Sequence, residues 1–313
     1  MLILYILLFF LSIAALLIGS DVVTDSSVRI ARKSGIGELV TGFLLISVAT
    51  SIPEMAVSIS AVLTGDVSVS IGNLLGSNIT NVCLIVGLSV VVAGKGMRIR
   101  KREARSLASM LFFSTVVPAI LLLPGSRFLV GLILIFFFGY YCYYVLKRKI
   151  RYERMKKIER KGLAFDILIF LVGIGIVMFS ARFTVTSSVL LSNHLGIDKS
   201  VIGATVIALG TSLPELVITL SAGKANHPKL ALGNAVGSCL TNLTLILGSV
   251  LMISPFVIDI SVYTTLISFT IISTMLLRYY LEDGRIGFSE SIALLILYFI
   301  FILMLLEFSF IGV

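Results

Sequence analysis

Charged residues are scarce in this sequence of 313 residues. Asp, Glu, Lys and Arg together make up 13% of it, whereas about 25% is usual in a soluble domain. Hydrophobic residues make up 58%, and the mean hydropathy is +1.11. These values exclude an ordinary soluble domain and predict an all-α, polytopic membrane protein.

Cysteine and histidine are also scarce, which excludes the metal centres built from them. The three cysteines, Cys83, Cys142 and Cys239, lie in apolar stretches without a C-x-x-C spacing, as expected of small buried side chains. The two histidines, His194 and His227, fall in predicted loops. We therefore expect no cofactor and, because no nucleophile–base pair is apparent, no enzymatic activity.

The formal net charge of +9 does not predict nucleic-acid binding, because the basic residues lie in short gaps between apolar segments. Such a pattern sets the orientation of a membrane protein. The Lys- and Arg-rich gaps 95–105 and 147–161 are expected on the cytoplasmic side. The gaps expected outside have no Lys or Arg: 65–67, 124–126, 192–198 and 254–258. The sequence thus predicts a multi-pass protein of the cell membrane with both termini outside.

Ten stretches are long and apolar enough to span a bilayer, which takes about 20 residues each. The first has no basic region ahead of it and is interpreted as a membrane helix, not as a signal peptide. The ten stretches are 2–31, 37–64, 68–93, 104–123, 127–147, 163–191, 199–223, 228–253, 259–279 and 287–308.

An internal repeat organises these segments. Shifted by 161 residues, the second and third segments align without a gap on the seventh and eighth. The shared residues are mostly polar or backbone-special: Gly42/Gly203, Thr50/Thr211, Ser51/Ser212, Pro53/Pro214, Glu54/Glu215, Gly72/Gly233, Asn73/Asn234, Gly76/Gly237, Ser77/Ser238, Asn81/Asn242 and Gly87/Gly248.

Five helices separate equivalent points of the repeat, and an odd number makes the two copies enter the membrane in opposite senses. The prediction is two inverted five-helix repeats, 1–147 and 163–313, joined by a basic cytoplasmic linker, 148–162. Inverted repeats are typical of secondary transporters, whose site lies at the repeat interface near the bilayer midplane.

Each copy places a carboxylate within an apolar segment, directly after a proline and two hydroxyl residues. A charge at this depth costs roughly 2.5–3.5 kcal/mol, so the chain is expected to use it. Proline removes a backbone donor and breaks the helix, which adds carbonyl oxygens to the cluster. Such hard oxygen donors suit Na⁺ or Ca²⁺. The two motifs contain Thr50, Ser51, Pro53 and Glu54, and Thr211, Ser212, Pro214 and Glu215.

The following segments supply further polar groups. Four-residue spacing puts Ser77 and Asn81 on one helix face, and likewise Ser238 and Asn242. A Gly-x-x-x-Gly spacing ahead of each pair predicts close helix packing. Elsewhere, Asp25 and Arg29 are expected to form a pair one helical turn apart.

The two copies of Thr-Ser-x-Pro-Glu, each followed by Gly-Asn-x-x-Gly-Ser-x-x-x-Asn, resemble the α-repeats of the calcium/cation antiporter superfamily, and particularly its prokaryotic sodium/calcium exchangers. The resemblance implies that Glu54 and Glu215 are shared ligands of Ca²⁺ and Na⁺. It further implies side-chain ligands at Thr50, Ser51, Ser77, Thr211, Ser212 and Ser238, carbonyl ligands near Ser47, Thr50, Ala208 and Thr211, and Asn81 and Asn242 at the middle of the site.

Two positions depart from the family pattern. The first motif begins with Ala49 where the second keeps Gly210. Asn242 stands where some relatives have an acid, which argues against K⁺ co-transport and leaves two acids in the core. Their charge of −2 is balanced by one Ca²⁺ or by two Na⁺.

The sequence therefore favours a Na⁺/Ca²⁺ antiporter that works by alternating access, with the bilayer as its surroundings and no obligatory protein partner evident. An H⁺/Ca²⁺ antiporter is the alternative, in which the same glutamates titrate. The proton exchangers of the superfamily carry Asn in place of Ser-x-Pro before the Glu, which favours Na⁺. A passive Ca²⁺ channel is a third hypothesis, disfavoured because one chain supplies a complete pseudo-symmetric site.

Overall fold

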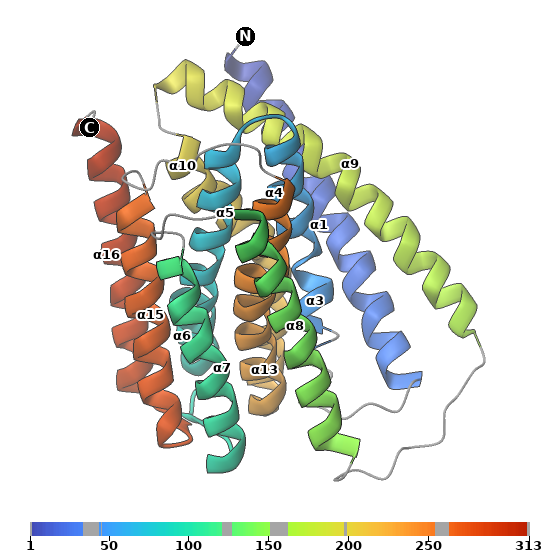
Figure 1. Cartoon of the computed structure of the whole chain (residues 1–313), viewed down its shortest axis with the longest axis vertical. Helices are drawn as coiled ribbons and strands as arrows, with labels where there is room; N and C mark the ends of the chain where they lie inside the picture. Colours follow the sequence, from blue (N-terminus) through green and yellow to red (C-terminus); the bar gives the residue numbers. More distant parts are fainter. Residues whose placement is uncertain are drawn as a thin grey trace.

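The computed structural model describes residues 2–33, 44, 46–120, 127–150, 162–196, 199–253 and 263–311, and most of them are helical (Figure 1). Six helices are long and continuous, and their described ends agree with six predicted segments within a few residues. They are α1 (Leu2–Lys33), α7 (Lys101–Ile120), α8 (Arg127–Ile150), α9 (Leu163–Leu195), α15 (Thr264–Glu282) and α16 (Phe288–Ile311).

The four repeated segments are irregular helices. The second and seventh are broken just before Pro53 and Pro214, as predicted, whereas the third and eighth run on as Val67–Ala93 and Pro228–Ile253 with a π-helical turn inside each that was not predicted. The first repeat has α3 (Ser47–Thr50), α4 (Ile52–Leu63), α5 (Val67–Ile79), the π-helical turn η2 (Thr80–Ile85) and α6 (Val86–Ala93). The second has α10 (Lys199–Ile202), the π-helical turn η3 (Gly203–Ile207), α11 (Ala208–Thr211), α12 (Leu213–Lys224), α13 (Pro228–Leu240), the π-helical turn η4 (Thr241–Ile246) and α14 (Leu247–Ile253).

Within the described residues, seven helices are long and apolar enough to cross a membrane. An eighth span is formed if α10–α11 and α12, bent by 47° at their junction, count as one. The α4 helix, with 12 residues, is apolar but too short on its own. The chain is thus a helical, multi-pass membrane protein.

The helices form a central group and an outer pair. The α5–α6 and α13–α14 stretches are central, with 78% of their most apolar window buried. That share is 22% in α1, α9 and α16 and 17% in α8. The α1 and α9 helices lie side by side along one edge of the molecule (Figure 1). They expose large apolar side chains such as Leu11 and Phe179, as lipid-facing helices do.

Ion pairs join the two outer helices at one end. Arg29 Nε of α1 donates to Asp166 Oδ1 of α9 at 2.8 Å, and Lys33 Nζ donates to Asp166 Oδ2 at 2.5 Å. The predicted pairing of Arg29 with Asp25 is therefore wrong. Helical spacing made Asp25 available, but the tertiary packing of α1 on α9 brings a nearly buried carboxylate to Arg29 instead.

Glycines let the repeats pack with their backbones in contact, as the Gly-x-x-x-Gly spacing predicts for the first repeat. A Cβ on Gly76 of α5 would lie within 2.6 Å of the Ala204 Cα of η3, and one on Gly203 would lie 2.7 Å from the Val69 carbonyl oxygen. The fold therefore requires glycine, which has no side chain, at these crossings. This contact brings the third and seventh predicted segments together.

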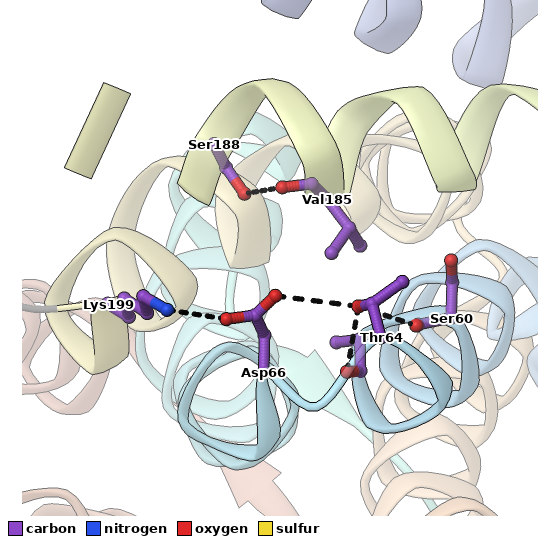
Figure 2. A network of polar contacts seen from close by, with 7 residues as sticks. Ser60, Thr64, Asp66, Val185, Ser188 and Lys199 are labelled. Carbon is purple, nitrogen blue, oxygen red and sulfur yellow. Dashed lines mark hydrogen bonds and ion pairs between the residues drawn. The ribbon is translucent and has the colours of Figure 1, made fainter. Parts of the chain in front are cut away.

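A second ion pair ties the two repeats at the opposite end of the core. Lys199 Nζ, at the start of α10, contacts Asp66 Oδ1 in the α4–α5 turn at 2.6 Å (Figure 2). Thr64 of the same turn donates to the Ser60 and Ala61 carbonyls. Both ends of this pair fall in or beside gaps that were predicted on the outside.

A short antiparallel sheet closes the other end. It pairs β1 (Met97–Arg98) with β2 (Arg285–Ile286) in the register Met97↔Ile286 and Arg98↔Arg285. The predicted linker 148–162 falls mainly on 151–161, outside the described residues, so its position stays a prediction.

Candidate functional site

The site begins at two helix breaks, one in each repeat. Ser51 separates α3 from α4 with φ −81° and ψ 3°, and Ser212 separates α11 from α12 with φ −86° and ψ 6°. Each is followed by a proline in the first turn of the next helix, where its missing N–H is tolerated. Glu54 and Glu215 thus lie in the first turn of their helices, where a carboxylate is favoured by the helix dipole.

Hydrogen bonds cross between the repeats at these breaks. Ser212 Oγ of the second motif donates to Glu54 Oε1 of the first at 2.9 Å. Reciprocally, Ser51 Oγ donates to Glu215 Oε1 at 3.4 Å. Each carboxylate is therefore held by a hydroxyl from the other repeat, and the two motifs form one site.

Two asparagines that were noted only as repeat identities hold this arrangement together. Asn73 Nδ2 of α5 donates to Ser58 Oγ at 3.0 Å and lies 3.4 Å from the Glu54 carbonyl oxygen, while its Oδ1 accepts from Thr211 Oγ1 at 3.2 Å. Asn73 thereby connects the first glutamate helix to the second motif.

The equivalent Asn234 of α13 repeats these contacts. Its Nδ2 donates to Thr219 Oγ1 at 3.0 Å and lies 3.5 Å from the Glu215 carbonyl oxygen, while its Oδ1 lies 3.5 Å from Thr50 Oγ1. The repeat alignment could have identified both asparagines, and also Ser58 and Thr219, the hydroxyl residues one turn after each glutamate.

Of the predicted serine and asparagine pairs, Ser238 contacts the glutamate motifs directly, and the other three residues are buried. Ser238 Oγ donates to Glu215 Oε1 at 3.3 Å and lies 3.5 Å from Thr50 Oγ1. Ser77 Oγ and both side-chain amide atoms of Asn81 and Asn242 have no partner among the described residues. Asn81 and Asn242 lie in π-helical turns, which spacing alone did not predict and which often occur at functional sites.

The carbonyl oxygens of Ser47 and Ala208 lie one turn before the breaks. Ser47 O accepts from Ser51 N at 3.0 Å and from Thr50 Oγ1 at 3.2 Å. Ala208 O accepts from Ser212 N at 3.1 Å and from Thr211 Oγ1 at 3.3 Å. These carbonyls are thus engaged in the turn, although they lie within reach of the hydroxyls that the sequence predicted as ligands.

The site is deeply buried. All the predicted site residues, namely Ser47, Thr50, Ser51, Glu54, Ser77, Asn81, Ala208, Thr211, Ser212, Glu215, Ser238 and Asn242, are at most 2% exposed. Glu54 Oε2 and Glu215 Oε2 have no hydrogen-bond partner among the described residues. A buried carboxylate without a counter-charge is costly, so the arrangement suits a cation coordinated by oxygen.

Known membrane proteins of one family resemble this chain along most of its length. The sequence pattern of the sodium/calcium exchanger protein family matches residues 4–147 and 165–307. The chain is 31% identical to a sodium/calcium exchanger of Methanosarcina acetivorans, over 96% of this chain and 97% of that one. An uncharacterised membrane protein of Methanocaldococcus jannaschii is 29% identical over the same shares.

Solved structures of the sodium-calcium exchanger NCX_Mj share the fold. One of them, soaked with 2.5 mM Na⁺ and 0.1 mM Ca²⁺, superposes with a TM-score of 0.69 at 27% identity, and the match covers 96% of this chain and 98% of that one. A structure soaked with 10 mM Na⁺ and no Ca²⁺ gives a TM-score of 0.68 at 28% identity.

Proposed function

The chain belongs to the sodium/calcium exchanger protein family, and from that premise we propose that it exchanges Na⁺ for Ca²⁺ across the cell membrane at a site built on Glu54 and Glu215. The observation that carries the proposal is the pair of buried carboxylate oxygens without hydrogen-bond partners among the described residues, one from each repeat. Buried polar atoms of this kind normally have a partner, and here a cation supplies it.

The donor set fits hard cations. It consists of two carboxylates, the hydroxyls of the two Thr-Ser motifs and of Ser77 and Ser238, and two central amides. Ca²⁺ takes six to eight such oxygen ligands, and Na⁺ accepts the same chemistry. The resemblance noted in the sequence implies that the glutamates and hydroxyls are ligands and that the two asparagines lie at the middle of the site.

Exchange follows from charge balance. Two ionised glutamates carry −2, which one Ca²⁺ or two Na⁺ neutralise, so the two substrates compete for one pair of acids. A loaded site is close to neutral and can be carried through a low-dielectric barrier, whereas an empty site of −2 cannot. The empty return step is thereby disfavoured, and transport of one ion is coupled to transport of the other.

Alternating access would come from the outer pair of helices. The α1 and α9 helices lie together beside the central group, and Asp166 connects them through Arg29 and Lys33. Gly19 of α1 lets the two backbones approach closely, since a Cβ there would lie 3.1 Å from the Val177 backbone nitrogen. We propose that α1 and α9 slide or rock as one body against the core and expose the glutamates to each side in turn.

The proposed topology is ten membrane helices in two inverted repeats, 1–147 and 163–313, with both termini outside. Equivalent elements support it, because α4, α5 and η2 recur as α12, α13 and η4 at one offset of 161 residues. The ion pairs Arg29–Asp166, Asp66–Lys199 and Glu103–Lys229 each join regions predicted on the same side.

The test separates the driving ions. Purified protein is reconstituted into liposomes loaded with Ca²⁺, and release is followed with a Ca²⁺ indicator while a Na⁺ gradient or a pH gradient is imposed alone. Release with Na⁺ and none with the pH gradient is the expected result. Release driven by the pH gradient alone would mean that H⁺, and not Na⁺, is the ion exchanged for Ca²⁺. Release without either gradient would indicate a channel.

A further inference from the structure

A cavity of about 430 Å³ lies at the end of the core that is predicted to be cytoplasmic, and its lining includes Gly223 near the end of α12, the helix whose first turn holds Glu215. Three segments from different parts of the chain surround it. They are the turn after α6, the α12–α13 turn and the strand β2. The cavity therefore lies between the two repeats, and no part of the ion-exchange proposal uses it.

Basic side chains line this cavity. Lys95 and Arg98 come from the turn after α6 and from β1, and Arg285 comes from β2. None of the three has an ion pair within the part of the chain that the structure describes. Their neighbours do, since Lys229 pairs with Glu103 at 3.0 Å and Arg278 pairs with Glu282 at 3.7 Å. The cavity thus gathers three basic side chains, of which Arg285 also interacts electrostatically with Glu290.

The two arginines oppose each other across the short sheet. Its register pairs Met97 with Ile286, both buried, and Arg98 with Arg285, both exposed. Like charges directly opposite each other destabilise a strand pair. The buried Met97–Ile286 pair and the hydrogen bond from Ile99 N to Gly284 O hold the sheet together, and an anion between the arginines would relieve the repulsion that its register creates.

Glycine and asparagine shape the cavity for a small anion. A Cβ on Gly96 would lie 3.5 Å from Arg285 Nε, so this position lets the guanidinium lie over the backbone. Asn226 adopts a left-handed conformation with φ 60°, in a turn closed by hydrogen bonds from Asn226 N to Gly223 O and from His227 N to Ala222 O. Its amide adds a neutral donor to the lining.

We propose that this cavity binds a phosphate group, presented either by the head group of an anionic lipid or by a free phosphate. Arginine recognises phosphate oxygens through its planar fork of donors, and basic pockets between membrane helices on the cytoplasmic side are suited to anionic head groups. Bound phosphate bridges Arg98 of the first repeat and Arg285 of the second, and so ties the two repeats together at this end of the core.

Binding is tested with a pair of charge-matched variants of the full-length protein. The double variant R98Q/R285Q removes the opposed arginines, and R100Q/K101Q removes two exposed basic residues of the same stretch that do not line the cavity. In nanodiscs of phosphatidylcholine with or without phosphatidic acid, native mass spectrometry counts retained lipid. In detergent, inorganic phosphate is titrated and the melting temperature is recorded.

The wild type and R100Q/K101Q are expected to retain the phosphate probe, whereas R98Q/R285Q should bind it about tenfold or more weakly, since a hydrogen bond to a charged group contributes at least about that factor. Retention of phosphatidic acid without a response to inorganic phosphate identifies a lipid as the source, and the reverse identifies free phosphate. Lys95→Gln, in an exposed turn, provides a milder variant if the double variant does not fold, and it should weaken binding in the same direction.

Equal weakening in R98Q/R285Q and R100Q/K101Q would overturn the proposal, because general surface charge would then explain the binding. So would binding of neither probe by the wild type, or binding that neither R98Q/R285Q nor Lys95→Gln changes.

Discussion

The surroundings of Glu54 and Glu215 are built from the same residue types, but their hydrogen bonds differ. Glu54 Oε1 has one short contact, from Ser212 Oγ at 2.9 Å, whereas Glu215 Oε1 shares two longer ones, from Ser51 at 3.4 Å and Ser238 at 3.3 Å. Ser77, the equivalent of Ser238, makes none within the described residues. The two half-sites, one around each glutamate, therefore have equivalent sequences but differ in how many hydroxyl oxygens are not engaged in hydrogen bonds to the protein.

The largest effect is expected from removing the glutamate charge, which both half-sites have in common. Glu54→Gln and Glu215→Gln should each weaken Ca²⁺ binding at least about 100-fold and abolish exchange, because removing one partner of a buried ion pair costs about 3–5 kcal/mol. Ca²⁺ flux into proteoliposomes under a Na⁺ gradient is the measurement. Glu282→Gln, whose side chain is 58% exposed, is the matched control and should transport normally.

Ca²⁺ flux retained by one glutamate variant and lost in the other would mean that a single half-site carries the charge. Flux retained by both variants would place the site elsewhere.

A third acid should change the competition between the ions. Asn242→Asp and Asn81→Asp each add a carboxylate at a position that the family resemblance puts in the middle of the site. The Na⁺ concentration that displaces half of the bound Ca²⁺ should therefore shift by about tenfold, the scale on which one nearby charge moves an ionic equilibrium. Ca²⁺ uptake at increasing Na⁺ measures it. Competition curves identical to those of the wild type would count against a central position of the two asparagines.

The two serines should separate stability from ion binding. Ser238→Ala removes a donor from Glu215 and should cost about 1 kcal/mol, or a fall of about 2–4 °C in melting temperature without ions. Ser77→Ala removes a hydroxyl that has no partner in the described structure, so the melting temperature should not fall. Both variants should weaken Ca²⁺ binding when Ca²⁺ is titrated into the protein. Equal falls in melting temperature would contradict the proposed difference between the two half-sites.

The smallest effect concerns the residue before each motif. Gly210→Ala makes the second motif resemble the first, which has Ala49. A Cβ at position 210 would lie 3.3 Å from Ile13 Cδ1 of α1, the flexible end of a side chain that can shift. Stability should therefore change by no more than about 1 kcal/mol, the helix preference of Ala over Gly. A larger loss of stability in thermal unfolding would show that α1 is tightly fixed at Ile13.

The sequence predicted the glutamates, their prolines and the segments that carry them, because a duplicated charge in an apolar stretch is conspicuous. It did not predict that Ser212 binds Glu54 or that Ser51 binds Glu215. Periodicity assigns a residue to a face of its own helix, but the partner across the interface depends on how the repeats cross. The roles of Asn73 and Asn234 were missed for the same reason.

The backbone irregularities also escaped the sequence. Spacing places Asn81 on the face of Ser77 in a regular helix, yet the π-helical turn from Thr80 to Ile85 changes that register. No residue in this turn is a recognised helix breaker, so composition carried no signal. The pairing of Arg29 with Asp166, 137 positions apart, was similarly hidden behind the local alternative Asp25.

The crossed hydroxyls also constrain how the sequence can change. Ser212 is 158 positions from Glu54 in the chain, yet a substitution there alters the surroundings of that carboxylate directly. Neither repeat alone contains a glutamate together with the motif hydroxyl that binds it. In the proposed site, the smallest unit able to hold an ion is accordingly the pair of repeats, and a substitution in one copy acts on the carboxylate of the other.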